Sequence, residues 1–70
     1  MKFIKEEPIG RGSCYIYEDE IWFISVWHVY RRRWEFHILN NKDKRFLNSG
    51  HFKTMKQAIA EIKFLMENWL

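Results

Sequence analysis

The chain has 70 residues, which is enough for one domain and too few for a second. A hydrophobic content of 47% excludes a disordered chain, and no apolar run approaches the ~20 residues that a membrane span needs. The net charge of +3 permits contact with nucleic acid without requiring it, and the single cysteine excludes an intrachain disulfide and favours a cytoplasmic setting.

Residues 1–13 are predicted to form an N-terminal segment and loop, because Pro8, Gly10 and Gly12 are residues that break regular structure. The two glycines flank Arg11, but no strand is expected before this loop and no helix after it. The loop therefore lacks the pattern of a nucleotide-binding site.

Residues 14–48 are predicted to form an antiparallel β-meander of three to four strands, in an α+β fold with one C-terminal helix. Runs rich in aromatic and β-branched residues alternate with polar turns, and the predicted strands cover 14–17, 21–29, 33–39 and 44–48. The second of these runs is apolar on both faces. Its sequence leaves open which face packs on the helix.

The strand at 33–39 shows the clearest alternation of the chain. Its apolar set is predicted to face the core and its polar set to face solvent: Trp34, Phe36 and Ile38 on one side, and Arg33, Glu35 and His37 on the other. Aromatic residues amount to 19%, more than one sheet face and one helix stripe can hide. We therefore expect exposed rings that contact a partner or a second copy, so a homodimer is compatible with the sequence.

Residues 54–69 are predicted to form the helix. Thr54 and Gln57 fit a capping box, in which each side chain satisfies a free backbone N–H. The apolar stripe has the period of a helix and comprises Met55, Ala58, Ile59, Ile62, Leu65, Met66 and Trp69. Phe64 falls on the opposite side, either as a singly exposed residue or as a contact with a partner.

A basic end of the sheet follows from the meander topology. Successive turns alternate between the two ends, so the turn at 30–33 is expected beside the start of the helix, whose free N–H groups favour anions. The basic residues expected there are Arg11, Arg31, Arg32, Arg33, His51 and Lys53. The alternative is that these arginines form an ordinary solvated turn.

No pattern of catalytic or metal-binding residues is present. Cys14, His28, His37 and His51 follow no known ligand spacing, and a catalytic Cys–His pair would need an oriented third group. We expect no cofactor, no metal and no enzyme activity. Aromatic residues beside Arg and His on a solvent-facing sheet suit nucleic-acid bases or a protein partner equally. The alternative is tighter packing, through a bulge in the strand at 21–29 or through Phe3 and Ile4 folding over that face.

The segment Gly50-His51-Phe52-Lys53-Thr54-Met55-Lys56-Gln57-Ala58 resembles AP2-like arm-type DNA-binding domains, which precede phage and transposon tyrosine integrases. Those domains carry Gly-Phe-x-Thr-x-x-Glu-Ala where the last strand enters the helix. The resemblance covers roughly residues 21–66 and implies that the sheet enters the major groove of DNA. The contacts it implies are Arg31, Arg32, Arg33, Lys42, Lys44 and Arg45. His51 is an insertion relative to the motif, and the sheet has fewer basic residues than a groove reader needs.

Two functional hypotheses result. The first is a nucleic-acid-binding module that contacts phosphates of DNA or RNA through basic turns, using Arg11, Arg31, Arg32, Arg33, Lys42, Lys44, Arg45 and Lys53. The second is a protein-binding inhibitor encoded by a phage or mobile element, similar to anti-CRISPR proteins, that acts on a host nuclease complex. The candidate residues for a protein partner are Tyr30, Glu35, His37 and Phe64.

Overall fold

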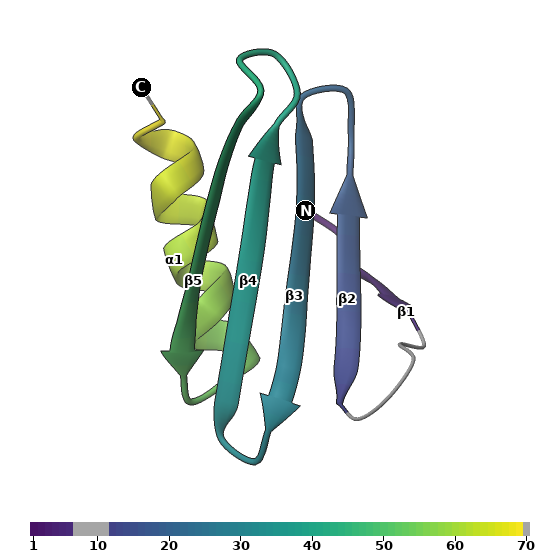
Figure 1. The fold of residues 1–70 in the computed structure, drawn as a ribbon, viewed down its shortest axis with the longest axis vertical. Helices are drawn as coiled ribbons and strands as arrows, with labels where there is room; N and C mark the ends of the chain where they lie inside the picture. The colour runs from purple at the N-terminus through teal and green to yellow at the C-terminus, as the bar shows by residue number, and fades with distance from the viewer. Residues whose placement is uncertain (7–11, 70) are drawn as a thin grey trace.

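The computed structural model describes residues 1–6 and 12–69, with the side chain of Tyr30 outside this description. The described part contains five strands and one helix: β1 (Ile4–Glu6), β2 (Ser13–Glu18), β3 (Trp22–Tyr30), β4 (Arg33–Asn40), β5 (Arg45–Phe52) and α1 (Met55–Glu67) (Figure 1). Each strand pairs antiparallel with its neighbour in sequence, in the order β1-β2-β3-β4-β5. The predicted α+β meander with one C-terminal helix is confirmed.

The predicted number of three to four strands is too low, because β1 adds an edge strand from the segment predicted as loop. Its three residues pair with β2, with Ile4 opposite Ile16 and Glu6 opposite Cys14. A three-residue strand is too short to show an alternating pattern, so only the pairing itself reveals it.

The last strand is longer than the predicted range of 44–48. It continues through Ser49 and Gly50 to Phe52, because a β-bulge absorbs the irregular residues: Phe36 pairs with Ser49, but Trp34 pairs with Phe52. Gly50 and His51 therefore both lie opposite the one residue between those partners on β4. A glycine inside a strand often marks such a bulge.

The helix begins at the predicted residue. The hydroxyl of Thr54 accepts a hydrogen bond from the backbone N–H of Gln57 at 3.1 Å. The side chain of Gln57 accepts from the backbone N–H of Lys53 at 3.0 Å, one residue before the donor of a standard capping box. Phe64 is 58% exposed, on the side of α1 away from the core as predicted.

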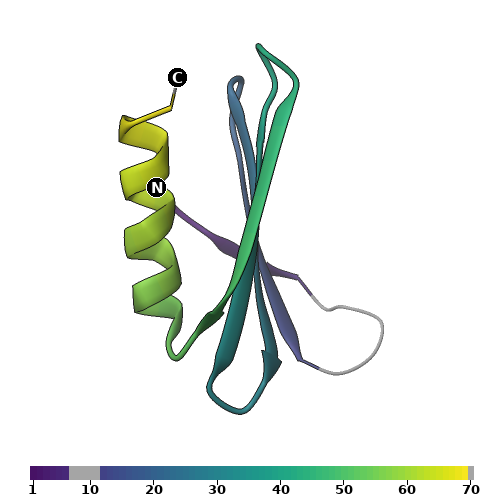
Figure 2. The same ribbon diagram turned by 60° about the vertical axis from the view of Figure 1, so that its left-hand side comes forward.

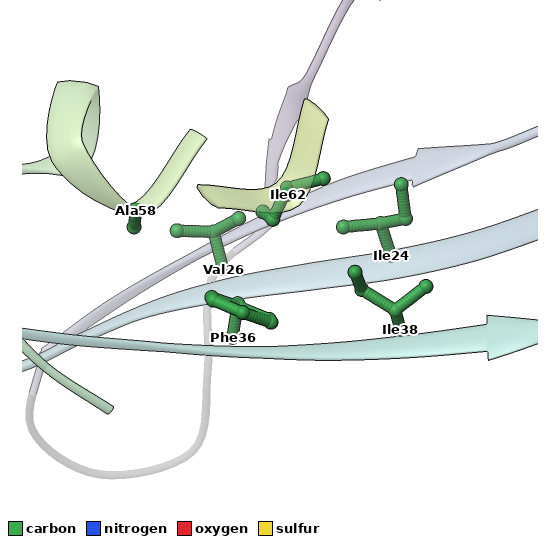
Figure 3. Close-up of a cluster of buried hydrophobic side chains, with 6 residues drawn as sticks. All are labelled: Ile24, Val26, Phe36, Ile38, Ala58 and Ile62. Atoms are coloured by element: carbon green, nitrogen blue, oxygen red, sulfur yellow. The ribbon is translucent and has the colours of Figure 1, made fainter. Parts of the chain in front are cut away.

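The core lies between α1 and one face of the sheet (Figure 3). Ile24 and Val26 of β3 pair with Ile38 and Phe36 of β4, and all four are fully buried beneath Ala58 and Ile62 of α1. The face of β3 that packs on the helix is thus the one carrying Ile24 and Val26. The predicted core face of β4 is confirmed.

The helix and the N-terminus lie on the same side of the sheet (Figure 2). Phe3 packs against Tyr17 with ring centroids 6.0 Å apart, and both join the core cluster. Ile4 is 65% exposed, so Phe3 and Ile4 do not fold together over the solvent-facing side. That side is covered by no helix among the described residues, and we call it the open face.

Candidate functional site

The open face is built from three rows of side chains that run across the strands. The register places Ile4, Ile16, Ser25, His37 and Asn48 in the central row; Glu18, Phe23, Leu39 and Phe46 in the second; and Glu6, Cys14, Trp27 and Glu35 in the third. The helix occupies the other face, so alternation along each strand turns these residues away from the core.

Large apolar side chains form a patch on the open face, which the polar residues Ser25 and His37 of the central row interrupt. The patch comprises Ile4, Ile16, Phe23, Trp27, Leu39 and Phe46. Phe46 is 52% exposed, and the members in the middle of the sheet are half-buried by their neighbours. The indole N–H of Trp27 donates to the Ser25 hydroxyl at 3.3 Å, which satisfies the polar group buried inside the patch.

The charged residues of the open face lie in its outer rows and are mainly acidic. They are Glu6, Glu18 and Glu35 in these rows, with Arg33 beyond the third row at the start of β4. The Arg33 guanidinium pairs with the Glu35 carboxylate at 3.1 Å, which offsets the positive charge of Arg33. His37 lies beside Phe46, with ring centroids 5.6 Å apart.

A cavity of about 190 Å³ opens on the open face beside the bulge of β5. Its polar lining includes Glu35, His37, Asn48 and His51. His51 has a φ of 71°, a left-handed conformation that non-glycine residues rarely adopt. The sequence contains a signal for this feature, a glycine just after the predicted strand at 44–48, but the predicted strand stops before that glycine.

The residues predicted to bind nucleic acid divide between the two ends of the sheet. Arg31 and Arg32 form the β3–β4 turn, at the end where β5 leads through Lys53 into α1 (Figure 1). All three side chains are exposed, so the predicted basic end is present. Arg11 lies outside the described residues.

The other predicted basic residues lie at the opposite end or are paired. Lys42 and Lys44 belong to the β4–β5 turn. The Arg45 guanidinium lies 4.4 Å from the ring centroid of Trp69 and 3.9 Å from the Asp43 carboxylate. The seven described members of the predicted set therefore do not form one surface.

The residues predicted to contact a protein also divide. Glu35 and His37 lie on the open face, whereas Phe64 lies on the exposed side of α1. The side chain of Tyr30 lies outside the description. The patch residues Phe23, Trp27 and Phe46 were missed, because a strand that is apolar on both faces does not indicate which face is solvent-exposed.

The histidines and the cysteine serve separate packing roles. His28 stacks on Trp34 with centroids 4.4 Å apart, and its Nε2–H donates to the backbone carbonyl of Arg31. Cys14 is 3% exposed, and burial raises the pKa of its thiol above the usual 9.0, with a smaller contribution from the Glu6 charge. Across residues 1–6 and 12–69, no cluster of three or more His, Cys, Asp or Glu side chains could hold a metal ion.

The chain matches no protein-family model, no curated protein and no solved structure. In the described part of the chain, no helix has the length and apolar character required to cross a bilayer.

Proposed function

We propose that the chain is a non-catalytic protein-binding domain and that the open face is its interface. The observation that carries this proposal is the set of large apolar side chains on a sheet face that no described helix covers. Aromatic residues are enriched in the centre of protein interfaces, and charged residues are depleted there. The open face has aromatic rings on β3 and β5, and Glu6 and Glu18 lie at its border.

The size of the face supports the same function. Five strands about 4.8 Å apart, with about seven residues each at a rise of about 3.4 Å, give an area of about 450 Å². This estimate covers the whole open face, its polar side chains included. It is about half of the ~800 Å² that one partner buries in a standard interface, which corresponds to a small interface.

The charges of the face specify the chemistry of the partner. Glu6 and Glu18 border the patch, and the charge of Arg33 is offset by Glu35. Electrostatic complementarity therefore favours a protein whose apolar surface is bordered by Lys and Arg. The nucleic-acid-binding surface of a host nuclease complex has this chemistry, and covering it would inhibit the complex, as phage and mobile-element inhibitors do.

A matched pair of phenylalanines tests the proposal. Phe46 lies on the open face and is 52% exposed, and Phe64 lies on the far side of α1 and is 58% exposed. The Phe64→Ser variant should capture the same protein from a host lysate as the wild type. The Phe46→Ser variant should lose it, and the purified partner should form a 1:1 complex in which β4 and β5 are protected from hydrogen exchange. Equal capture by both variants, or no partner, contradicts the proposal.

A second copy of the chain is the competing occupant of the open face. Sedimentation equilibrium of the wild type and of Phe46→Ser separates the two cases. A monomeric wild type supports a different protein as the partner. A dimer that Phe46→Ser converts to monomer would mean that the face is closed by self-association, and it would overturn the hetero-partner proposal.

Nucleic acid is the second candidate partner, and one observation favours it. Arg31, Arg32 and Lys53 are exposed, and the β3–β4 turn lies at the end of the sheet where α1 begins, so basic residues and the helix N-terminus share that end. Nucleic acid is the second candidate because of the composition of the open face, the surface that the resemblance to AP2-like domains would direct at DNA. Of the six DNA contacts that the resemblance implies, this face carries only Arg33, and Arg33 is paired with Glu35. A groove-reading sheet needs several unpaired basic residues.

Salt-dependent binding tests this second candidate. Fluorescence anisotropy with labelled DNA and RNA at about 50 mM salt should detect binding that weakens steeply as salt rises. The double variant Arg31→Ala/Arg32→Ala should weaken it, and Phe46→Ser should not. The absence of binding to both DNA and RNA at this salt concentration removes the candidate.

A further inference from the structure

We infer that the cavity beside the β5 bulge binds a guanidinium group, namely that of an arginine side chain at the border of the partner's apolar surface. This inference rests on the proposed function, because the cavity opens on the open face. It adds to that function by naming one polar contact, an arginine guanidinium of the partner that enters the cavity beside the apolar surface.

The bulge creates the cavity. Two residues of β5, Gly50 and His51, lie opposite the position that one residue would fill in a regular ladder, and the backbone turns aside at His51. Bulges commonly redirect side chains next to binding sites. The left-handed conformation of His51 costs free energy, and such strain is concentrated at functional positions.

Because Gly50 has no side chain, the side chain of Glu35 occupies the space next to the Gly50 backbone. A Cβ atom at position 50 would lie 2.8 Å from Cγ and 3.1 Å from Oε1 of Glu35. A larger residue here would push the carboxylate out of position and fill part of the cavity. The absence of a side chain at this position thus keeps Glu35 beside the opening.

The lining has the groups that a guanidinium needs. Glu35 is the one carboxylate in the lining, and it already accepts a guanidinium hydrogen bond from Arg33 through Oε1 at 3.1 Å. Both members of that pair are partly exposed, so it contributes little free energy and exchanges easily. A carboxylate can accept the parallel N–H groups of an incoming arginine through both oxygens.

A second acceptor and a planar ring complete the cavity lining. Asn48 adds a carboxamide oxygen that, within the described residues, accepts no hydrogen bond. The ring of His37 also lines the cavity, and a planar guanidinium stacks on a flat ring better than an ammonium does. The volume of about 190 Å³ equals that of about six water molecules at ~30 Å³ each, which is sufficient for a guanidinium and its adjoining methylene.

The test uses methylguanidinium chloride as the probe, with two-dimensional ¹H–¹⁵N NMR of the intact chain. Saturable shifts are expected at the amides of Glu35, Asn48, Gly50 and His51, with a dissociation constant of about 1–10 mM, as suits so small a ligand. Methylammonium chloride at the same ionic strength should bind at least about threefold more weakly, because it lacks the planar fork. Absence of saturable shifts, or equal affinity for both cations, overturns the inference.

Two variants locate the site. Glu35→Gln should weaken methylguanidinium binding by about fivefold or more, since a charge-assisted hydrogen bond is lost. Glu18→Gln, a carboxylate of the same face outside the cavity, should bind like the wild type. The NMR spectrum itself reports whether each variant is folded, and Asn48→Ala serves if Glu35→Gln is not. Wild-type affinity in a folded Glu35→Gln or Asn48→Ala variant overturns the inference.

The probe experiment needs no protein partner, so its result is independent of the proposed function. Methylguanidinium binding without any protein capture would leave the cavity as a site and remove the proposed interface. Capture that depends on Phe46, without methylguanidinium binding, would leave the interface and remove the guanidinium site.

Discussion

The indole N–H of Trp69 donates a hydrogen bond to Oδ2 of Asp43 at 3.0 Å, between residues 26 apart in sequence. The same indole meets Trp22 edge to face at 5.0 Å between ring centroids and lies beneath the Arg45 guanidinium. These contacts tie the residues after α1 to the end of the sheet opposite Arg31 and Arg32. The helix is thereby held at both ends, by Thr54 at its start and by Trp69 beyond its last turn.

Replacing Trp69 by Phe is expected to raise the pKa of Asp43. The hydrogen bond from Trp69 is the largest cause that holds the pKa of this carboxyl below its ordinary 3.8, followed by the backbone N–H of Arg45. A folded pKa below the unfolded value stabilises the fold above the unfolded pKa, and this contribution is lost as pH falls through the folded pKa. As pH falls below about 4, the free energy of unfolding of Trp69→Phe should therefore decrease less than that of the wild type. NMR titration of the Asp43 carboxyl carbon measures the change.

The carboxyl of Asp19 is the internal control for that titration. Its pKa is lowered mainly by the hydroxyl of Tyr17, which donates at 2.6 Å, and also by the backbone N–H groups of Trp22 and Ile21. None of these donors is the Trp69 indole, so the pKa of Asp19 should not move. An unchanged pKa of Asp43 in Trp69→Phe would contradict the assigned cause.

Gly12→Ala is expected to destabilise the fold by at least about 2 kcal/mol. Gly12 has a φ of 97°, and a Cβ at this position would lie 2.1 Å from the backbone carbonyl oxygen of His28. The backbone of β3 cannot move aside without breaking its pairing with β2. Gly50→Ala is the comparison, because its added Cβ meets the movable side chain of Glu35 and should cost less. Urea denaturation of the two variants measures which one loses more free energy of unfolding. An equal decrease in both variants would contradict this reasoning.

Thr54→Ala is expected to lower the free energy of unfolding by about 1 kcal/mol through loss of the helix N-cap. The alanine has no oxygen to accept the backbone N–H of Gln57, which the threonine accepts at 3.1 Å. Thr54→Ser keeps that acceptor and should retain most of the stability. Thermal unfolding followed by circular dichroism compares the variants, and the prediction is wrong if the serine variant loses as much as the alanine variant.

Cys14 is expected to react with Ellman's reagent at least about 100-fold more slowly in the folded chain than in urea. The thiol is 3% exposed, and burial, with a smaller effect of Glu6, raises its pKa above 9.0. A raised folded pKa gives a stabilisation that is complete below the unfolded pKa and is lost as pH rises through the folded value. Stability should thus decline above about pH 9. Rapid labelling of the folded chain at neutral pH would contradict the burial.

The helix and the core face of β4 were determined by local sequence. Thr54 and Gln57 define the start of α1 because both hydrogen bonds of the cap join residues within four positions of each other. Phe36 and Ile38 identify the buried face of β4 because polar residues alternate with them. The position of Arg31 and Arg32 beside the start of α1 also follows from sequence, since turns of a meander alternate between its ends.

Tertiary structure alone decided the open face, the strand β1 and the bulge. Both faces of β3 are apolar, so its sequence does not indicate which face is buried. Ile24 and Val26 pack under Ala58 and Ile62, and Trp27 therefore lies on the open face. Gly50 is a local sign of a bulge, but the pairing of β1 and the register on either side of His51 depend on hydrogen bonds to distant residues. A single helix of 13 residues covers only one side of a five-stranded sheet. For this reason the candidate interface became visible only when the strands and the helix were placed together.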